Sequence, residues 1–339
     1  PKSVSDIQGA MIEPGAVALY GVDRGGVTAG SSVLVSGAGP IGFLTLLAAR
    51  AAGATKIFVS EPNPARRKLA AQLVPGVIVI NPLEQYTHAH LYDAHFQEDM
   101  PIFLKEINEA GVTEVWLPNC DSESWVDLKK LSDNYPDFVL PMIGLHPTYV
   151  KENYQAELAA LKSELEKTKV LAIGEIGLDY YWDTTFAEQQ MDAFKQQCHW
   201  ALDLGLWVDI HCRKAYADLI KTLKLPEFKN LCGIIHCFAG DAREAKVLTD
   251  LGYYLGIGGV ITYKNTTLFQ DIKDIPLSKI VLETDAPYLS PVPFRGKPNS
   301  PKNIPIIAQK LADLFEVGLD HLVDQTNQNA QQLKAISGY

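Results

Sequence analysis

Short apolar segments alternate with helix patterns over about three-quarters of this chain, and the alternation repeats every ~25–35 residues. Apolar runs such as Ile234-Ile235 and Val281-Leu282 are typical of parallel strands that helices cover on both faces. Eight strands, each followed by a helix, are the number that closes a (β/α)8 barrel, so we expect an α/β fold of this type over residues 87–339. The expected strands lie near residues 87–90, 113–118, 138–144, 170–175, 206–211, 233–238, 254–258 and 279–285, and the expected helices near 98–110, 123–134, 153–167, 186–203, 214–223, 241–251, 266–273 and 303–317.

Residues 1–86 have a different amino-acid composition, which is rich in Gly, Ala and Val. Three strand patterns alternate with two helix patterns, and the first turn carries the spacing Gly37-x-Gly39-x-x-Gly42. In this context, with Glu61 at the end of the second strand, the pattern is typical of a partial Rossmann β-α-β-α-β unit that binds a dinucleotide. Glu61 would accept from a ribose hydroxyl, which favours NAD over NADP. A glycine-rich turn in another kind of α/β unit stays open as an alternative.

The N-terminal segment resembles part of the coenzyme-binding domain of the medium-chain alcohol and polyol dehydrogenases. Those enzymes also need a preceding catalytic domain with zinc-binding Cys and His residues, and here no Cys occurs before Cys120. We therefore expect no hydride transfer, although NAD binding stays open. The resemblance is carried by Ile12-Glu13-Pro14, Arg24-Gly25-Gly26-Val27, Gly30, Val33-Leu34-Val35 and Gly37-Ala38-Gly39-Pro40-Ile41-Gly42.

Metal-binding types of side chain recur at the carboxyl ends of the expected barrel strands. Two histidines one residue apart share a face of an extended segment, and the carboxyl ends of barrel strands meet at one mouth. Four imidazoles and two carboxylates suit divalent ions of borderline softness, and six ligands are enough for two ions. Each residue alone is more often a satisfied polar group of the core or of a loop, but the coincidence of all of them favours a metal centre. The candidates are His88, His90, Glu175, His211, His236 and Asp285.

The C-terminal 253 residues (87–339) resemble the TatD family of metal-dependent deoxyribonucleases and hydrolases, within the wider amidohydrolase group. The resemblance implies a barrel hydrolase that cleaves phosphodiester bonds of DNA through a metal-activated water, with Mg²⁺, Mn²⁺ or Zn²⁺. It further implies that His88, His90 and Asp285 hold one ion, and that Glu175 bridges to a second ion held by His211 and His236. The matching stretches are Thr87-His88-Ala89-His90-Leu91, Gly144-Leu145-His146-Pro147, Gly174-Glu175-Ile176-Gly177-Leu178-Asp179-Tyr180, Ile210-His211-Cys212-Arg213, His236-Cys237-Phe238, Glu283-Thr284-Asp285-Ala286-Pro287-Tyr288-Leu289 and Arg295-Gly296-Lys297-Pro298-Asn299.

Two carboxylates are the candidate catalytic residues. Asp285 is either a general base or purely a ligand, and Glu175 either bridges the ions or accepts from a histidine N–H. Arg295 and Lys297 follow the eighth strand on a loop rich in Gly and Pro. Composition alone favours a solvated loop, whereas the resemblance favours contacts between these charges and substrate phosphates, and Arg213 is a weaker candidate for that contact.

Other residues near the strand ends have two open interpretations. His146 either contacts substrate or stabilises the turn before the following proline. Tyr181 and Trp182 could stack on bases, but we expect them to pack at the rim. Strand alternation predicts that Cys212 and Cys237 are buried thiols directed away from the mouth, towards the helices.

Charge and cysteine content bound the partners and the compartment. The formal net charge of −10 argues against a broad basic face, so a DNA substrate (single-stranded or at 3′ ends) would need positive charge concentrated at the mouth. Five cysteines without a CxxC motif indicate free thiols in a reducing compartment. No apolar run predicts a membrane span and the start carries no signal-like segment, so we expect a cytoplasmic protein without an obligate protein partner.

The sequence at the junction between residues 1–86 and residues 87–339 fits a regular barrel strand poorly. Pro82 cannot donate within a central strand, and Glu84 and Gln85 are poor residues for a buried one. We therefore expect a fusion of two unrelated pieces with an irregular first barrel strand, which would affect the placement of His88 and His90. The alternatives to a metal-dependent hydrolase are an NAD-dependent oxidoreductase and a non-catalytic fusion chain.

Overall fold

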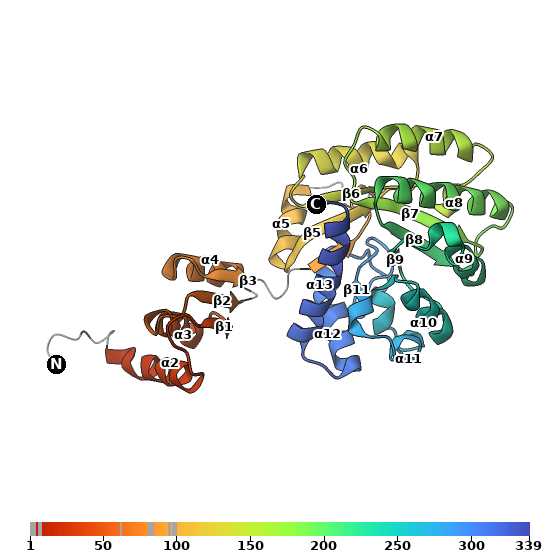
Figure 1. Cartoon of the computed structure of the whole chain (residues 1–339). Coiled ribbons are helices and arrows are strands. Elements are labelled where there is room, and N and C mark those ends of the chain that lie inside the picture. Colours follow the sequence, from red (N-terminus) through yellow and green to blue (C-terminus); the bar gives the residue numbers. More distant parts are fainter. Residues whose placement is uncertain (1–4, 6–8, 62, 81–84, 94–95, 97–99) are drawn as a thin grey trace. The chain divides into compact units, whose positions relative to one another are not determined.

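The computed structural model describes residues 5, 9–61, 63–80, 85–93, 96 and 100–339. The chain divides into two compact units, Pro1–Leu83 and Glu84–Tyr339, and each has its own parallel sheet and its own core (Figure 1).

The first unit is a three-stranded parallel sheet in the order β1-β2-β3, with two crossover helices. The strands and crossover helices follow the predicted order, whereas the first helix was not predicted. Val35, Leu46 and Val59 belong to the apolar core. The strands are β1 (Ser32–Ser36), β2 (Lys56–Ser60) and β3 (Ile78–Ile80), and the helices are α2 (Ile12–Arg24), α3 (Pro40–Ala51) and α4 (Pro64–Leu73).

The glycine-rich turn between β1 and α3 is tightly packed. A Cβ on Gly42 would lie 2.0 Å from the carbonyl oxygen of Gly37, so only glycine fits there. Glu61 is buried, and its carboxylate accepts N–H groups from Ala38 at 2.6 Å and Asn63 at 2.8 Å. The residue predicted to bind a ribose is therefore engaged by the backbone around the turn, and nucleotide binding by Gly37, Gly39, Gly42 and Glu61 stays a prediction.

The second unit is a barrel of eight parallel strands in sequential order, as predicted. The first and last strands approach each other just beyond their ends, where Asp285 N–H donates to His88 O at 3.0 Å and His90 N–H donates to Ala286 O at 2.7 Å. The strands are β4 (Gln85–His88), β5 (Val112–Pro118), β6 (Val139–Ile143), β7 (Ala172–Asp179), β8 (Val208–Arg213), β9 (Gly233–Ile235), β10 (Tyr254–Ile257) and β11 (Ile280–Leu282).

Helices surround this barrel (Figure 1). Among the described residues, no helix combines the length and the apolar character that crossing a membrane requires. The α-helices are α5 (Met100–Glu109), α6 (Ser122–Asn134), α7 (Tyr154–Leu165), α8 (Ala187–Leu204), α9 (Tyr216–Leu223), α10 (Ala242–Asp250), α11 (Leu268–Ile272), α12 (Ile304–Phe315) and α13 (Leu319–Ile336). The short 3-10 helices are Pro147–Tyr149, Pro226–Phe228, Gly259–Thr262, Leu277–Lys279 and Pro301–Asn303.

Helix α13 was not predicted, and its buried face combines apolar residues with Thr326 and Asn329. Asn329 is buried and donates to the carbonyl oxygens of Leu277 and Ile280, both at 2.7 Å. Leu333 joins a core cluster with Trp116 and Trp207 from the barrel strands. The helix therefore closes one end of the barrel core through contacts that an apolar periodicity does not reveal.

Strand β4 is irregular, as the junction sequence predicted. Its register against β5 shifts between Gln85 and Tyr86, whereas the pairing of Thr87 and His88 is regular. The other junction residues of the prediction, Pro82 and Glu84, lie outside the described residues. The irregularity therefore ends before the two histidines, and both have buried side chains.

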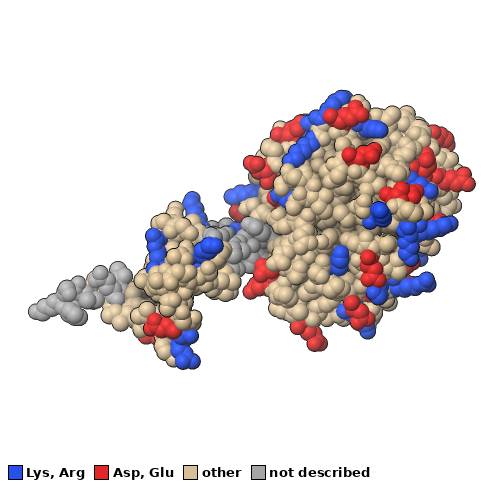
Figure 2. All heavy atoms as spheres, viewed as in Figure 1, with Lys and Arg blue, Asp and Glu red and all other residues tan. Residues whose placement is uncertain are grey.

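Surface charge in the barrel unit is mixed. Acidic and basic side chains are interspersed over the face shown in Figure 2, in keeping with the net charge of −10. Any attraction of a polyanion must therefore come from local groups of basic side chains rather than from the field of the whole molecule.

Candidate metal centre

The six predicted ligands come from five different strands and meet at one mouth of the barrel. His88 ends β4, Glu175 lies within β7 and His211 within β8. His236 follows β9 directly, and Asp285 lies three residues beyond the end of β11. Parallel strands bring their carboxyl ends to the same rim, so positions nearly 200 residues apart in sequence become neighbours.

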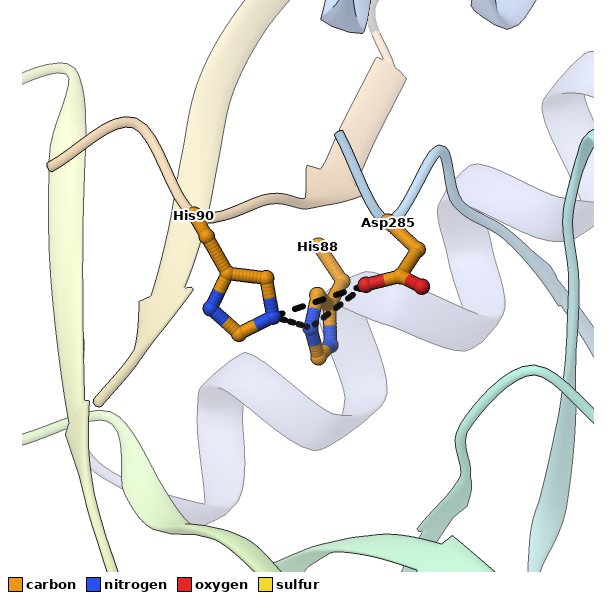
Figure 3. Close-up of side chains that lie close together, drawn as sticks. All are labelled: His88, His90 and Asp285. Atoms are coloured by element: carbon orange, nitrogen blue, oxygen red, sulfur yellow. Dashed lines mark hydrogen bonds and ion pairs between the residues drawn. The ribbon is translucent and has the colours of Figure 1, made fainter. Parts of the chain in front are cut away.

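His88, His90 and Asp285 form one compact group (Figure 3). The Nε2 atoms of the two histidines are 3.4 Å apart, and Asp285 Oδ1 lies 3.4 Å from His90 Nε2 and 3.9 Å from His88 Nε2. One ligand atom from each residue lies within 4.8 Å of the others, a spacing that a single ion can span. Glu175 Oε2 closes the group at 3.5 Å from His90 and 3.7 Å from His88.

The other oxygen of Glu175 faces a second set of imidazoles. Oε1 lies 3.1 Å from His211 Nδ1, 3.3 Å from His146 Nε2 and 3.7 Å from His236 Nε2. The ligand atoms of His146, Glu175 and His211 lie within 4.8 Å of one another. Glu175 thus presents one oxygen to each set, which is the arrangement that a carboxylate bridging two ions requires.

His146 is a candidate ligand that the sequence did not identify as one. Its Nδ1 contacts Thr148 Oγ1 at 2.7 Å and accepts the Thr148 N–H at 3.2 Å, so the predicted turn-stabilising contact is present. Its Nε2 nevertheless faces Glu175. The signal available in the sequence was its place shortly after β6, near the carboxyl end of a barrel strand like the other candidates.

Each of the predicted histidine ligands has its remaining ring nitrogen within 3.2 Å of an oxygen of another side chain. Such contacts orient an imidazole and fix its tautomer, and they are typical of metal-binding histidines. The residues that make them received no role from the sequence, although strand alternation places Asp209 and His211 on one face. The pairs are His88 Nδ1 with Asp209 Oδ2 (2.8 Å), His90 Nδ1 with Tyr92 OH (2.8 Å), His211 Nε2 with Asp179 Oδ2 (2.9 Å) and His236 Nδ1 with Glu283 Oε2 (3.2 Å).

Burial and neighbouring charges shift the pKa values of the candidate ligands. Burial opposes ionisation of Glu175, but His236 and His146 outweigh it and hold the pKa of Glu175 well below its usual value. Burial likewise opposes the charged form of Asp285, and His236 and His90 lower its pKa. Burial opposes protonation of His236, but the neighbouring Cys237 and acidic groups raise its pKa well above the usual value. A buried centre that keeps its carboxylates ionised and raises the pKa of His90, His211 and His236 fits divalent cations in its donor chemistry.

Cys237 does not point away from the mouth, so that prediction was wrong. Its φ of 42° breaks the strand alternation on which the prediction relied. The thiol Sγ lies 3.7 Å from Asp285 Oδ2, and both groups lie together with His236 in a candidate ligand cluster. Cys212 is buried in the main apolar core, as predicted.

The rim of the mouth carries the remaining predicted residues. Arg213 lies over the ring of Tyr181 at 3.7 Å and near that of Trp182 at 5.2 Å. These rings are 50% and 69% exposed, and they contact each other and Arg213 at the rim, as predicted. Arg295 lies 4.4 Å from the ring centre of Tyr263. Lys297 is exposed on the same loop.

The comparisons with known proteins agree with this geometry. Residues 87–334 match the model of the TatD related DNase family. The metal-dependent hydrolase YabD of Bacillus subtilis is 32% identical over 252 residues, which are 74% of this chain and 98% of that protein. A Pantoea ananatis protein named 3′-5′ ssDNA/RNA exonuclease TatD is 31% identical over 253 residues, or 72% of this chain and 96% of its own.

Solved structures show the same barrel. The TatD homologue YjjV of Escherichia coli has a TM-score of 0.70 at 30% identity, and the match covers 74% of this chain and 97% of YjjV. A TatD family hydrolase of Entamoeba histolytica shares the fold with a TM-score of 0.63 at 22% identity, over 74% of this chain and 98% of its own. The family match begins at Thr87, so residues 1–86 lie outside it. Through its barrel, this chain belongs to the TatD family of metal-dependent hydrolases.

Proposed function

We propose that the barrel hydrolyses phosphodiester bonds of single-stranded DNA, at internal positions or at 3′ ends. The observation that carries the proposal is Glu175, whose two oxygens face two separate sets of imidazoles within 3.7 Å. A pair of cations at that spacing suits a phosphodiester, whose charge is spread over several oxygens. The name of the Pantoea relative, a ssDNA/RNA exonuclease, supports this class of substrate.

Each candidate ligand has a place in this proposal. His88, His90 and Asp285 would hold one ion, Glu175 would bridge, and His211 and His236 would hold the second. His146 is an additional ligand candidate on the side of His211. Ions bound there, Mg²⁺, Mn²⁺ or Zn²⁺, would neutralise phosphate charge and make a nearby water more acidic.

Asp285 has two distinct oxygens for two tasks. Oδ1 faces the imidazoles of His90 and His236 at 3.4 and 3.7 Å, whereas Oδ2 faces the thiol of Cys237. In this proposal Oδ1 would be the ligand atom, and Oδ2 would accept a proton from the attacking water. Basic side chains at the rim, namely Arg213, Arg295 and Lys297, would bind the flanking phosphates.

The test is hydrolysis of a single-stranded oligonucleotide with added Mg²⁺, Mn²⁺ or Zn²⁺, together with metal analysis of the purified protein. We expect Glu175→Ala and Asp285→Ala to abolish cleavage and lower the metal content. Asp250→Ala is the matched control, because that carboxylate pairs with Lys246 on the exposed surface of α10. Full activity in both site variants would exclude these roles, and a wild-type protein inert towards nucleic acid would exclude the substrate.

A further inference from the structure

The exposed Phe, Tyr and Trp rings of the barrel unit lie on the side of its mouth. Within the described part of this unit, every exposed side chain of these three types lies on a segment that follows the carboxyl end of a strand. Rings left in water at one place on a soluble protein mark a site of interaction. These side chains are Tyr149, Tyr181, Trp182, Tyr288 and Phe294.

Two of these rings form an ordered unit with Arg213. The guanidinium lies 3.7 Å from the ring centre of Tyr181, and the ring of Trp182 meets that of Tyr181 edge-on at 5.0 Å and 85°. A cation over an aromatic face stabilises the pair and holds the ring in place. Trp182 remains 69% exposed and Tyr181 50% exposed, so both keep ring surface available to a ligand.

A single carboxylate connects this unit to the metal centre. Asp179 Oδ1 accepts the N–H of Tyr181 at 2.9 Å and that of Trp182 at 3.4 Å. Its other oxygen, Oδ2, holds Nε2 of the candidate ligand His211 at 2.9 Å. The position of the two rings is therefore coupled to that of an imidazole in the centre.

We propose that Tyr181, Trp182 and Arg213 form a stacking platform for one unpaired nucleobase beside the scissile phosphate. Any base has an aromatic face that can stack on these rings, and the guanidinium supplies positive charge for the adjoining phosphate. A base inside a duplex has no free face, so the platform selects single strands with little regard to base identity. The adjacent Lys214 is also exposed, and basic side chains gather around α9 in Figure 2, which complements a phosphate backbone.

This inference rests on the proposed function, and its test separates the two. The substrates are a short oligothymidylate and a strand of equal length made of abasic tetrahydrofuran residues, which keeps the phosphates and lacks the bases. The variants are Tyr181→Ala and Trp182→Ala, with Trp182→Phe to restore a ring. The control is Tyr20→Ala, an equally exposed tyrosine in the N-terminal unit.

We expect each alanine variant to raise the KM for oligothymidylate about tenfold, equivalent to about 1.4 kcal/mol, without changing the KM for the abasic strand. Trp182→Phe should recover most of the loss, and Tyr20→Ala should match the wild type. An unchanged KM, or an equal rise on both strands, would overturn the platform.

A binding measurement covers the case of a protein that cleaves neither strand. Stacking quenches the fluorescence of 2-aminopurine, so a strand carrying this base reports contact without turnover. Quenching that the alanine variants abolish would support the platform even if the wild type failed to cleave DNA and the proposed function fell. Absence of quenching by the wild type would overturn the platform.

Discussion

Replacing Gly256 by alanine should weaken the metal centre by displacing Glu283, the residue that orients His236. A Cβ at this position on β10 would lie 2.3 Å from Oε2 and 2.7 Å from Cδ of Glu283, far inside van der Waals contact. The Glu283 carboxylate is buried, accepts the Cys237 N–H at 2.6 Å and holds His236 Nδ1 at 3.2 Å. Gly256→Ala must therefore displace the group that orients His236.

The magnitude follows from the two contacts that are lost. Hydrogen bonds to a charged group contribute about 1.5–3 kcal/mol each, so displacing Glu283 should lower the free energy of unfolding by about 3–6 kcal/mol. Loss of the contact that orients a ligand typically weakens metal binding 10- to 100-fold. Urea unfolding and metal titration of the purified variant measure the two effects.

The neighbouring glycine provides a matched control. A Cβ on Gly258 would lie 3.6 Å from Glu283 O and 3.7 Å from its Cγ, which are ordinary contacts. Gly258→Ala should therefore stay within about 1 kcal/mol of the wild type, as a substitution without a steric clash does. Glu283→Asp combined with Gly256→Ala should be less destabilised than the sum of the single variants, because the shorter side chain relieves the overlap. Wild-type stability and metal affinity in Gly256→Ala would refute the reasoning.

Three further outcomes are expected. Saturation with the preferred divalent ion at 100 times its Kd should stabilise the barrel by about 2.7 kcal/mol and chelation should reverse this, whereas a melting temperature indifferent to both would argue against a metal centre. The pKa values of His90 and His236 lie well above the usual value because neighbouring groups outweigh the effect of burial. Metal binding at pH 7 should therefore release protons, and it should weaken as the pH falls. Equal calorimetric heats of binding in buffers of different ionisation enthalpy would contradict this. Leu333→Ala in α13 should cost about 2–5 kcal/mol in urea unfolding. Ile336→Ala, on the exposed face of the same helix, should cost little, and a similar loss from both variants would contradict the buried role of Leu333.

The barrel and the place of its centre could be predicted because both depend on local pattern. Apolar runs at regular spacing specify strands, and the carboxyl ends of parallel strands must meet at one rim. That rule brings the six candidate ligands to one rim, whereas the grouping of His88, His90 and Asp285 was implied by the resemblance to the TatD family. The irregular register of β4 was likewise readable, because Gln85 is a poor residue for a buried strand.

Contacts beyond the strand ends could not be predicted in the same way. Cys237 turns towards Asp285 because its φ is positive, and the direction of a side chain in such a segment depends on what packs around it. Helix α13 buries Asn329 against two carbonyl oxygens from another part of the chain, a contact that the sequence pattern does not reveal. Both outcomes arise from partners distant in sequence.

The sequence by itself determined the division of the chain into two parts, the order of the barrel elements and the types of ligand at the strand ends. These features depend on periodicity and strand direction, which are set within a few residues. Only the tertiary structure decided that Glu175 faces two sets of imidazoles, that His146 joins them, and that Asp179 connects His211 to the exposed rings at the rim. These are distances between side chains on different strands. They follow from the packing and closure of the barrel as a whole.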